Sequence, residues 1–505
     1  MARGEAHVPV LIGGGQVTWR GAPARSPELS PAGFMAEAAR RALADAGVQA
    51  ASIDRIAAVR MTADNRPPGV HPFGTANNVP RAVARRIGAN PATAIYGVIG
   101  GQSPQAFVNE CAEALHAGEC EMALIVAGEA TGLERAALRA GMELDWSEQV
   151  DGDCDDRGSG DLKINRAEVR HGMVLPVLVY SLIEQALRAR LGRSRDAHAQ
   201  AMAELFAGFS EVAAANPYAQ FPVERSAAFL RTESADNYRV SDPYLKWLVA
   251  QDAVSQGAAV LMTTEAKADE LGVPADKRIY LHGYATVSDL PLIERADMGA
   301  SRAAALAARA ALDMAGWQPQ HVDLADIYSC FPCAVTAACE ALDFTADDGA
   351  RLTVTGGLPY FGGAGNGYSL FAIAEMIARL RARPTAKGLI TANGGFMSKE
   401  SVGLYSAKPP ADWRPLGVSG LDAEAARGRF EVDTNPSSGM IETFTVAYAK
   451  GVATRALVIG RTEAGRRFAA ASEQPGTIAQ VLASEPIGRR VTVQPGERTN
   501  VFRFA

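Results

Sequence analysis

The sequence is poor in cysteine, with six in 505 residues, and aromatic residues make up only 7% of it. So few cysteines cannot form a disulfide scaffold, and we expect reduced thiols and a cytoplasmic protein. No apolar run approaches the roughly 18 residues that a membrane span requires, and the first residues lack the apolar core of a signal peptide. Neither sign of charge dominates, because the chain has 50 Lys and Arg and 56 Asp and Glu, which gives a net charge of -6. Because nucleic-acid binders are normally basic, we expect no nucleic-acid partner and no membrane span.

Apolar residues, in contrast, are plentiful. The chain is 48% hydrophobic and 21% charged, which is typical of a soluble globular protein and sufficient to bury a large core. At roughly 100–200 residues per domain, this length predicts two to four domains.

Two segments of the chain repeat each other at a constant offset of 269 residues. Residues 38–57 read AARRALADAGVQAASIDRIA, and residues 307–326 read AARAALDMAGWQPQHVDLAD. Shared composition explains the matching alanines, but it does not explain the Gly and the later Asp that both segments place at the same spacing. Each segment therefore predicts a helix that ends at a glycine and leads into a strand.

A second similarity links residues 100–130 with residues 362–395. Each begins with a glycine pair, continues through a helical stretch and ends in a strand; the pairs are Gly100-Gly101 and Gly362-Gly363. Alternating strands and helices predict an α/β fold with parallel strands, here duplicated within one chain. Ligand sites in such sheets form where loops leave the carboxyl ends of the strands, and these loops are rich in glycine.

Two further regions lie outside the repeated core. Residues 131–250 begin with an acidic run and continue with amphipathic helical patterns, so we predict a helical subdomain inserted in the first half. Residues 407–505 hold short β-rich runs, with nine Lys or Arg and five Asp or Glu from Ser437 onward. This basic charge is either ordinary surface charge or a patch for phosphates or an acidic partner. The predicted domains are 1–260, 261–406 and 407–505.

Two motifs that look functional are discounted. Residues 151–162 start like a calcium loop, but position six is Asp156 instead of Gly and position twelve is Leu162 instead of Glu. Gly13-Gly-Gly15 is read as the end of a strand and lacks the dinucleotide-binding fingerprint. No other Cys or His spacing suits a metal, so we expect no metal site.

The order of several short strings resembles the thiolase superfamily. They are Asn216–Phe221 (NPYAQF), Ser255–Ala259 (SQGAA), Tyr328–Phe331 (YSCF), Gly356–Gly363 (GGLPYFGG) and Ala392–Gly395 (ANGG). With the extra C-terminal module, the chain is most similar to the thiolase-like protein type 1 group. The resemblance implies a duplicated thiolase fold: two mixed sheets with helices between and outside them, a helical loop domain, and an additional β-rich C-terminal domain for which OB-like topology is one option.

The resemblance also implies a site, because thiolases use a nucleophilic Cys, an activating His and a second Cys on a coenzyme A thioester. The nucleophile's position falls at Gly100, and the His of the Gly-His-Pro motif falls at Gly363. The second Cys falls at Ala392, and the His of the His-Asp-Cys-Phe motif falls at Tyr328. All four substitutions remove the functional group, which argues against ordinary thiolysis through a cysteine acyl-enzyme.

Other side chains are weighed as substitutes. Ser103 is the nearest hydroxyl; it is either a nucleophile or, with Pro104 following it, the N-cap of a helix. Cys330 and Cys333 have the spacing of a redox pair, but no thioredoxin-like frame surrounds them and we interpret them as structural.

Of the four substitutions, Tyr328 offers the most useful chemistry, because a phenol can donate a hydrogen bond or shuttle a proton. It could equally pack and bond locally. We predict Tyr328, Asn393 and Ser103 as catalytic residues. The predicted substrate-binding residues are Gly100, Gly101, Gly362, Gly363, Asn366, Tyr368, Gly394 and Gly395.

Three functions follow from the resemblance. The first is an acyl-CoA acyltransferase similar to acetyl-CoA acetyltransferase, in lipid metabolism, with altered catalytic residues. The second is a lyase that cleaves a β-hydroxyacyl-CoA by retro-aldol chemistry with Tyr328 as the acid/base. The third is a non-catalytic acyl-CoA-binding or scaffold protein. In each, coenzyme A thioester is the ligand, no cofactor is covalently bound, and a homodimer or a protein partner at the C-terminal module is expected.

Overall fold

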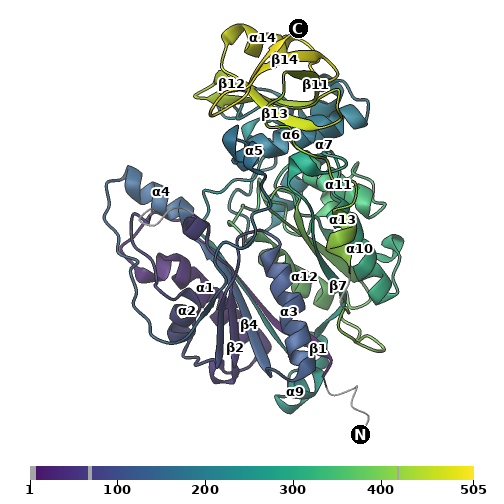
Figure 1. Ribbon diagram of the computed structural model, residues 1–505. Coiled ribbons are helices and arrows are strands. Elements are labelled where there is room, and N and C mark those ends of the chain that lie inside the picture. The colour runs from purple at the N-terminus through teal and green to yellow at the C-terminus, as the bar shows by residue number, and fades with distance from the viewer. Residues whose placement is uncertain (1–6, 66–70, 418–419) are drawn as a thin grey trace.

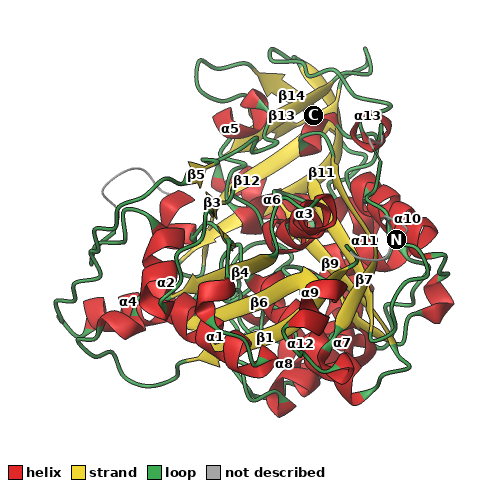
Figure 2. Ribbon diagram, turned by 90° about the horizontal axis from the view of Figure 1, so that it is seen from below, coloured by secondary structure: helices red, strands yellow, loops and turns green. Residues whose placement is uncertain are grey.

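The computed structural model describes residues 7–65, 71–417 and 420–505. Its core is one mixed sheet in the order β5-β3-β2-β4-β6-β1-β7-β10-β9-β8 (Figures 1 and 2). The strands are β1 (Pro9–Thr18), β2 (Arg55–Ala58), β3 (Thr93–Tyr96), β4 (Met122–Glu129), β5 (Asp155–Asp156), β6 (Gln256–Thr264), β7 (Ile279–Ser288), β8 (Leu324–Asp326), β9 (Lys387–Gly394) and β10 (Lys399–Ser406).

The predicted duplication is visible in the strand order. The first half runs β3-β2-β4-β6-β1, and the second half runs β8-β9-β10-β7. The inner pairs match: β2 lies parallel to β4 as β8 lies parallel to β9, and the two following strands are antiparallel in each half. The two sheets that we predicted are joined, because β1 and β7 pair at Val10 with Tyr280 and at Leu11 with Ile279.

Helices pack on this sheet from outside and between its halves. The outer helices α1 (Pro31–Ala46) and α10 (Arg302–Ala315) both end at a glycine in the left-handed region, Gly47 and Gly316, as the repeat predicts. The central helices are α3 (Ser103–Ala117) and α12 (Tyr368–Ala382), which contact each other. The remaining core helices are α2 (Val79–Ile87), α9 (Glu265–Glu270), α11 (Pro332–Ala341) and α13 (Leu421–Ala425).

The Gly13–Gly15 prediction was wrong, since these residues lie inside β1 and not at its end. A Cβ on either Gly13 or Gly15 would strike carbonyl oxygens of α1, those of Ala42 and Ala38. The glycines therefore allow α1 to approach the strand closely.

The insert is helical as predicted. It contains α4 (Thr131–Arg139), α5 (Arg166–Arg170), α6 (Pro176–Arg190), α7 (Arg195–Ala215) and α8 (Ala227–Arg231). Figure 1 shows α5, α6 and α7 between the sheet core and the C-terminal module. No helix among residues 7–65, 71–417 and 420–505 has the length and apolarity to cross a membrane.

The C-terminal module is a closed five-stranded barrel in the order β11-β12-β13-β15-β14. It consists of β11 (Ser438–Ala449), β12 (Val452–Arg461), β13 (Arg467–Ser472), α14 (Pro475–Ala483), β14 (Arg490–Gln494) and β15 (Val501–Phe504). Five strands closed in this order, with a helix before the fourth, have the topology of an OB-fold. The barrel has its own core around Phe444, Phe468 and Phe502, so it is a separate packing unit.

Candidate active site

The two glycine-rich loops meet at the N-terminus of α3, where Tyr328 contacts Gly101. A Cβ built on Gly101 would overlap the Tyr328 hydroxyl; it would also lie 2.8 Å from Tyr328 Cζ and 2.5 Å from the carbonyl oxygen of Asn393. Real Cβ atoms essentially never approach other heavy atoms within 3.0 Å. The phenol therefore takes the space that any side chain at position 101 would need.

Gln102 fills the adjacent space in the same way. A Cβ on Gly100 or on Gly394 would overlap Oε1 of Gln102 and lie 2.9 Å from its Cδ. Gln102 is buried, and its Oε1 has no hydrogen-bond partner among the residues that the structure describes. The predicted glycines 100, 101 and 394 thus come together, but two side chains occupy the volume between them.

Asn393 lies beside this volume on β9 and faces α6 of the insert. Its Nδ2 donates to the Tyr180 hydroxyl at 3.0 Å and approaches Cys330 Sγ at 3.7 Å. The Asn393 Oδ1 is buried with no partner in the described chain. Phe331 stacks on Tyr180 with ring centroids 4.3 Å apart. Asn393 therefore offers one unused carboxamide oxygen in an otherwise aromatic and thiol environment.

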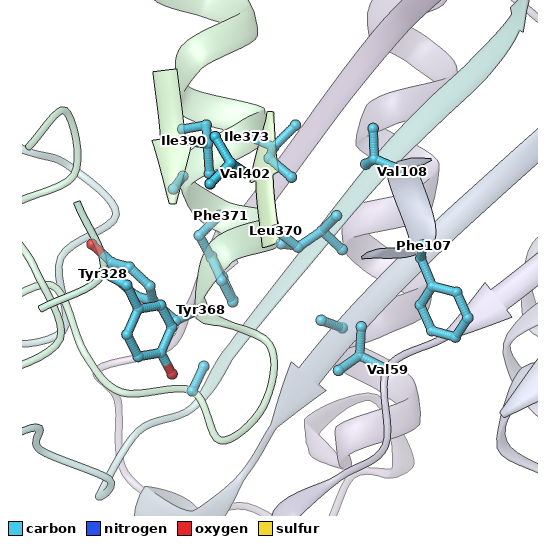
Figure 3. Close-up of a cluster of buried hydrophobic side chains, with 14 of the residues drawn as sticks. Val59, Phe107, Val108, Tyr328, Tyr368, Leu370, Phe371, Ile373, Ile390 and Val402 are labelled. Carbon is cyan, nitrogen blue, oxygen red and sulfur yellow. The ribbon is translucent and has the colours of Figure 1, made fainter. Parts of the chain in front are cut away.

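Tyr328 itself is buried, and its hydroxyl makes no hydrogen bond with a residue in the described ranges. Burial raises its pKa well above the ordinary value for tyrosine, and the neighbouring Cys330 and Glu400 add to this. The phenol therefore stays protonated near neutral pH, so its O–H can donate a hydrogen bond and its oxygen can accept one. In Figure 3 its ring lies beside that of Tyr368, with the two hydroxyl groups directed apart.

Tyr368, predicted to bind substrate, is held in a buried network instead. Its hydroxyl lies 2.8 Å from Asp326 Oδ1 and 2.6 Å from Thr355 Oγ1. The other oxygen of Asp326 accepts from the hydroxyls of Thr353 and Thr355 and from the backbone N–H groups of Val354 and Thr355. These contacts fix residues 353–355 to the end of β8, so the Tyr368 hydroxyl is already occupied.

Asn366 has a similar positioning contact. Its Oδ1 accepts from the Gly100 N–H at 3.1 Å, and its Nδ2 donates to the carbonyl oxygen of Arg60 at 2.8 Å. One side chain of the second half therefore fixes the Gly100 loop of the first half.

The N-cap interpretation of Ser103 was wrong. Gln102 occupies the N-cap position without a side-chain cap bond, and Ser103 is the first residue of α3. The Ser103 hydroxyl donates instead to the carbonyl oxygen of Val98 at 3.1 Å, which tightens the loop before the helix. No base acts on this hydroxyl in that arrangement.

The remaining predicted glycines do not border Tyr328. Gly362 packs against Gln256 at the start of β6, and the Gly363 N–H donates to Gln251 O at 2.8 Å. Gly395 adopts a left-handed turn with φ of 62° after β9. Its carbonyl oxygen receives a long hydrogen bond of 3.5 Å from Tyr180.

The thiols are buried and unactivated. Burial raises the pKa of Cys330 to about 12 and that of Cys333 well above its ordinary value. Both are free, and Cys333 lies in α11 as predicted. In the described part of the chain, no three Cys, His, Asp or Glu side chains are grouped to hold a metal ion.

Sequence reasoning missed a second group of residues, on the insert. Trp247 lies between two cations: the Arg225 guanidinium is 3.6 Å and the Lys246 Nζ is 4.8 Å from the indole centroid. Neither cation forms an ion pair with a residue that the structure describes. They line a cavity of about 520 Å³, which Glu224 and Asp236 also border. In the sequence this group consists only of an isolated Arg and a Lys-Trp pair 21 positions later.

A short chain segment connects this cavity with Tyr328's loop. Tyr360 stacks on Trp247 at 6.4 Å and donates to its carbonyl oxygen at 2.9 Å. Three residues further along, the Ala250 N–H donates to the carbonyl oxygen of Cys330 at 2.9 Å. Residues 247–250 therefore connect the cation pair with the Tyr328 loop through hydrogen bonds to Tyr360 and Cys330.

Two family models and a solved structure match this chain. Residues 285–407 match the thiolase C-terminal domain-like model, and residues 421–498 match the thiolase-like protein type 1 additional C-terminal domain. A monomeric SCP2-thiolase-like protein type 1 from Mycobacterium smegmatis is 38% identical, with a TM-score of 0.85, over 99% of this chain and 100% of that one. This chain belongs to the SCP2-thiolase-like protein type 1 family. The family assignment confirms both the thiolase fold and the extra C-terminal domain.

Two more distant similarities accompany this member of the thiolase-like type 1 family. An acetyl-CoA acetyltransferase from Methanocaldococcus jannaschii is 33% identical over 122 residues, which is 24% of this chain and 30% of that protein. The Ltp2-ChsH2(DUF35) aldolase has a TM-score of 0.59 at 16% identity, over 79% of this chain and 98% of the other. The second similarity shows the fold alone, and the first spans less than a third of the curated relative.

Proposed function

We propose that the protein binds a coenzyme A thioester without forming a cysteine acyl-enzyme. The observation that carries this proposal is the filled glycine site: Gln102 occupies the space where residue 100, at the nucleophile's position, would project a side chain, and Tyr328 occupies that of residue 101. The thiol beside Asn393, that of Cys330, is not available as a thiolate, because burial raises its pKa to about 12. Acyl transfer through sulfur needs a thiolate, so the chemistry of ordinary thiolases has no nucleophile here.

The insert supports binding of the nucleotide end of coenzyme A. Arg225 and Lys246 are two cations without carboxylate partners in the described chain, and they flank an indole at the mouth of a cavity of about 520 Å³. Guanidinium and ammonium groups suit phosphates, and an aromatic face suits an adenine ring. The Ala250–Cys330 contact then leads toward Asn393 and its unused Oδ1.

Calorimetry tests the binding step. Coenzyme A, 3′-dephospho-coenzyme A and acetyl-CoA are titrated into wild type, Arg225→Ala and Lys246→Ala, with Arg231→Ala as control because Arg231 lies on the same insert but pairs with Asp196. Each cavity variant should lose about tenfold or more in affinity, since a charge-assisted hydrogen bond contributes about 1.5–3 kcal/mol. Equal affinity in all four proteins would refute the assignment of the cavity.

A thiol assay tests the absence of acyl transfer. Wild-type protein with acetyl-CoA, or with acetoacetyl-CoA and coenzyme A, should release no free thiol above the rate without protein. Steady thiol release that survives Tyr328→Phe would contradict the proposal.

A lyase is the second candidate, because the Tyr328 hydroxyl is free of hydrogen bonds within the described chain and the fold is similar to that of an aldolase. With its raised pKa, Tyr328 would donate a hydrogen bond to the thioester oxygen while the β-hydroxyl loses its proton and the carbon–carbon bond breaks, which gives an aldehyde and a thioester enolate. The α-carbon of the enolate then takes up a proton, so that the net reaction only moves a proton from the hydroxyl to this carbon. Aldehyde release from a β-hydroxyacyl-CoA panel that disappears in Tyr328→Phe would favour this candidate. No aldehyde from wild type would exclude it for that panel.

A further inference from the structure

A short segment of the insert exposes an unusual number of large apolar side chains. Among the described residues, ten such side chains are strongly exposed, and four of them lie between positions 162 and 175. They are Leu162 at 44%, Val169 at 53%, Val174 at 41% and Leu175 at 56%. All four lie within 14 residues of the chain around the short helix α5, and a concentration of exposed apolar side chains is typical of an interaction surface. We call residues 162–175 the α5 surface.

The α5 surface is held rigidly by hydrogen bonds of its polar residues. Asn165 and Glu168 form a reciprocal capping box at the start of α5, and Glu168 also accepts from the Ile293 N–H at 2.9 Å. His171 donates from Nδ1 to Ala167 O at 2.7 Å and accepts at Nε2 from the Asn500 N–H of the barrel at 2.9 Å. The apolar side chains therefore stay in solvent because the backbone is fixed, and covering them would be favourable.

The same surface carries uncompensated positive charge on an acidic protein. Arg166 is exposed, and no hydrogen bond or ion pair joins it to a residue of the described chain. Arg170 donates only to backbone carbonyl oxygens of residues 496–498. The acid of the segment, Glu168, is buried in the capping box, so it does not neutralise them. An apolar centre with cations beside it is complementary to an acidic protein face with an apolar centre.

The α5 surface also adjoins the candidate site. The Leu162 carbonyl oxygen lies 3.9 Å from where a Cβ on Gly395 would be, and the Gly395 carbonyl receives the Tyr180 hydroxyl. Tyr180 in turn contacts Asn393. Figure 1 places α5 directly beside the barrel, at the edge of the core. A protein docked on this surface would thus stand next to the site that we assign to the thioester.

We propose that the α5 surface docks an acidic acyl-carrier protein that presents its acyl thioester on a phosphopantetheine arm. This inference rests on the proposed thioester function, and it names a protein-bound source beside free coenzyme A, whose pantetheine is chemically the same. A second copy of this chain is a poor occupant, because two α5 surfaces would bring like charges together. An anionic membrane is also disfavoured, since α5 has only five residues and presents no long amphipathic face.

The test measures docking separately from the thioester. Fluorescence anisotropy follows labelled apo-carrier protein, which lacks the arm, binding to full-length protein. Arg166→Glu and Leu175→Ser should each weaken binding by about tenfold or more, and added salt should weaken it for wild type. Leu138→Ser is the matched control, because Leu138 is 52% exposed on α4, away from this surface, and it should leave binding unchanged.

Three outcomes would overturn the inference or separate it from the proposed function. Absence of binding at about 0.5 mM carrier protein, or equal affinity in the Arg166, Leu175 and Leu138 variants, would refute the docking surface. Binding to vesicles with roughly one part anionic lipid in four, lost in the same variants while the carrier is ignored, would assign the surface to a membrane. If calorimetry shows that coenzyme A binds but the carrier protein does not bind, the docking inference fails and the thioester function stands. If the carrier protein binds but coenzyme A does not, only the assignment of the thioester site is refuted.

Discussion

Replacing Gly101 by alanine tests whether the Tyr328 phenol fills the space next to Gly100, the residue at the nucleophile's position. The added Cβ would lie 2.5 Å from the Asn393 carbonyl oxygen and 2.8 Å from Tyr328 Cζ, so backbone must move by about 0.5 Å to restore a 3.0 Å contact. Overpacking of a core typically costs about 1–3 kcal/mol. Alanine also reduces the freedom of the unfolded chain, which offsets about 0.4–1 kcal/mol. We expect Gly101→Ala to lower the free energy of unfolding by about 1–2 kcal/mol.

The assay is urea unfolding of the core, followed by tryptophan fluorescence, for Gly101→Ala, Tyr328→Phe and the double variant. Phenylalanine removes the hydroxyl that the new Cβ would overlap, but it leaves the Asn393 carbonyl in place. The alanine should therefore cost less in the Tyr328→Phe background, with a coupling energy of about 0.5 kcal/mol or more. An uncoupled pair, or an alanine that costs nothing in wild type, would show that position 101 has free space and that the pocket is open to a ligand.

Three other predictions concern the same core. Gly394→Ala should cost less than Gly101→Ala, because its Cβ meets chiefly the end of the Gln102 side chain, and Gln102→Ala should remove most of the cost in the same urea assay. Asp326→Asn should destabilise by about 2–4 kcal/mol, since an amide nitrogen would face donors that now bond to a carboxylate; loss of less than about 0.5 kcal/mol would contradict the network. Burial raises the pKa of Glu129 from 4.5 to about 7, so the fold binds its proton more tightly and stability should fall as pH rises from about 4.5 to 7. Glu129→Gln should remove that part of the pH dependence, about 1.4 kcal/mol per pH unit at most, in thermal or urea unfolding at several pH values.

Local signals in the sequence predicted the repeated core. The helices α1 and α10 end for the same physical reason, because each is followed by a glycine, Gly47 or Gly316, in the left-handed conformation. This signal can be read from a few consecutive residues. The helical insert and the β-rich module are also visible from periodicity. Strand β10, which ends the second half, and the short helix α14 were not predicted. Helix α14 was missed because it is only nine residues long and lies between strand-like runs.

The contents of the candidate site could not be predicted, because they depend on contacts between distant residues. The substitutions at Gly100, Ala392 and Tyr328 are visible in the sequence, but the overlap of Tyr328 with position 101 joins residues 227 positions apart. The Ser103 prediction failed for a local reason: the helix starts one residue earlier than the Ser-Pro pair suggests, so Gln102 takes the N-cap position and its side chain lies against Gly100 and Gly394. Trp247 and its two cations were missed because the insert's loop brings together residues with no common motif.

Helix α6 links the barrel to the candidate site, which gives the additional domain a physical role. In the first half of α6, the Tyr180 hydroxyl accepts a hydrogen bond from Asn393. Two residues later, the Leu182 carbonyl oxygen accepts a hydrogen bond from Thr443 of the barrel. Near its C-terminal end Arg188 forms an ion pair of 2.7 Å with Glu485, which follows α14. The barrel thus holds the middle and the C-terminal part of α6, and a shift of the helix along its axis would break these contacts. The barrel therefore restricts the position of Tyr180, and ligands that require Tyr180 to move must also displace the barrel or bend α6.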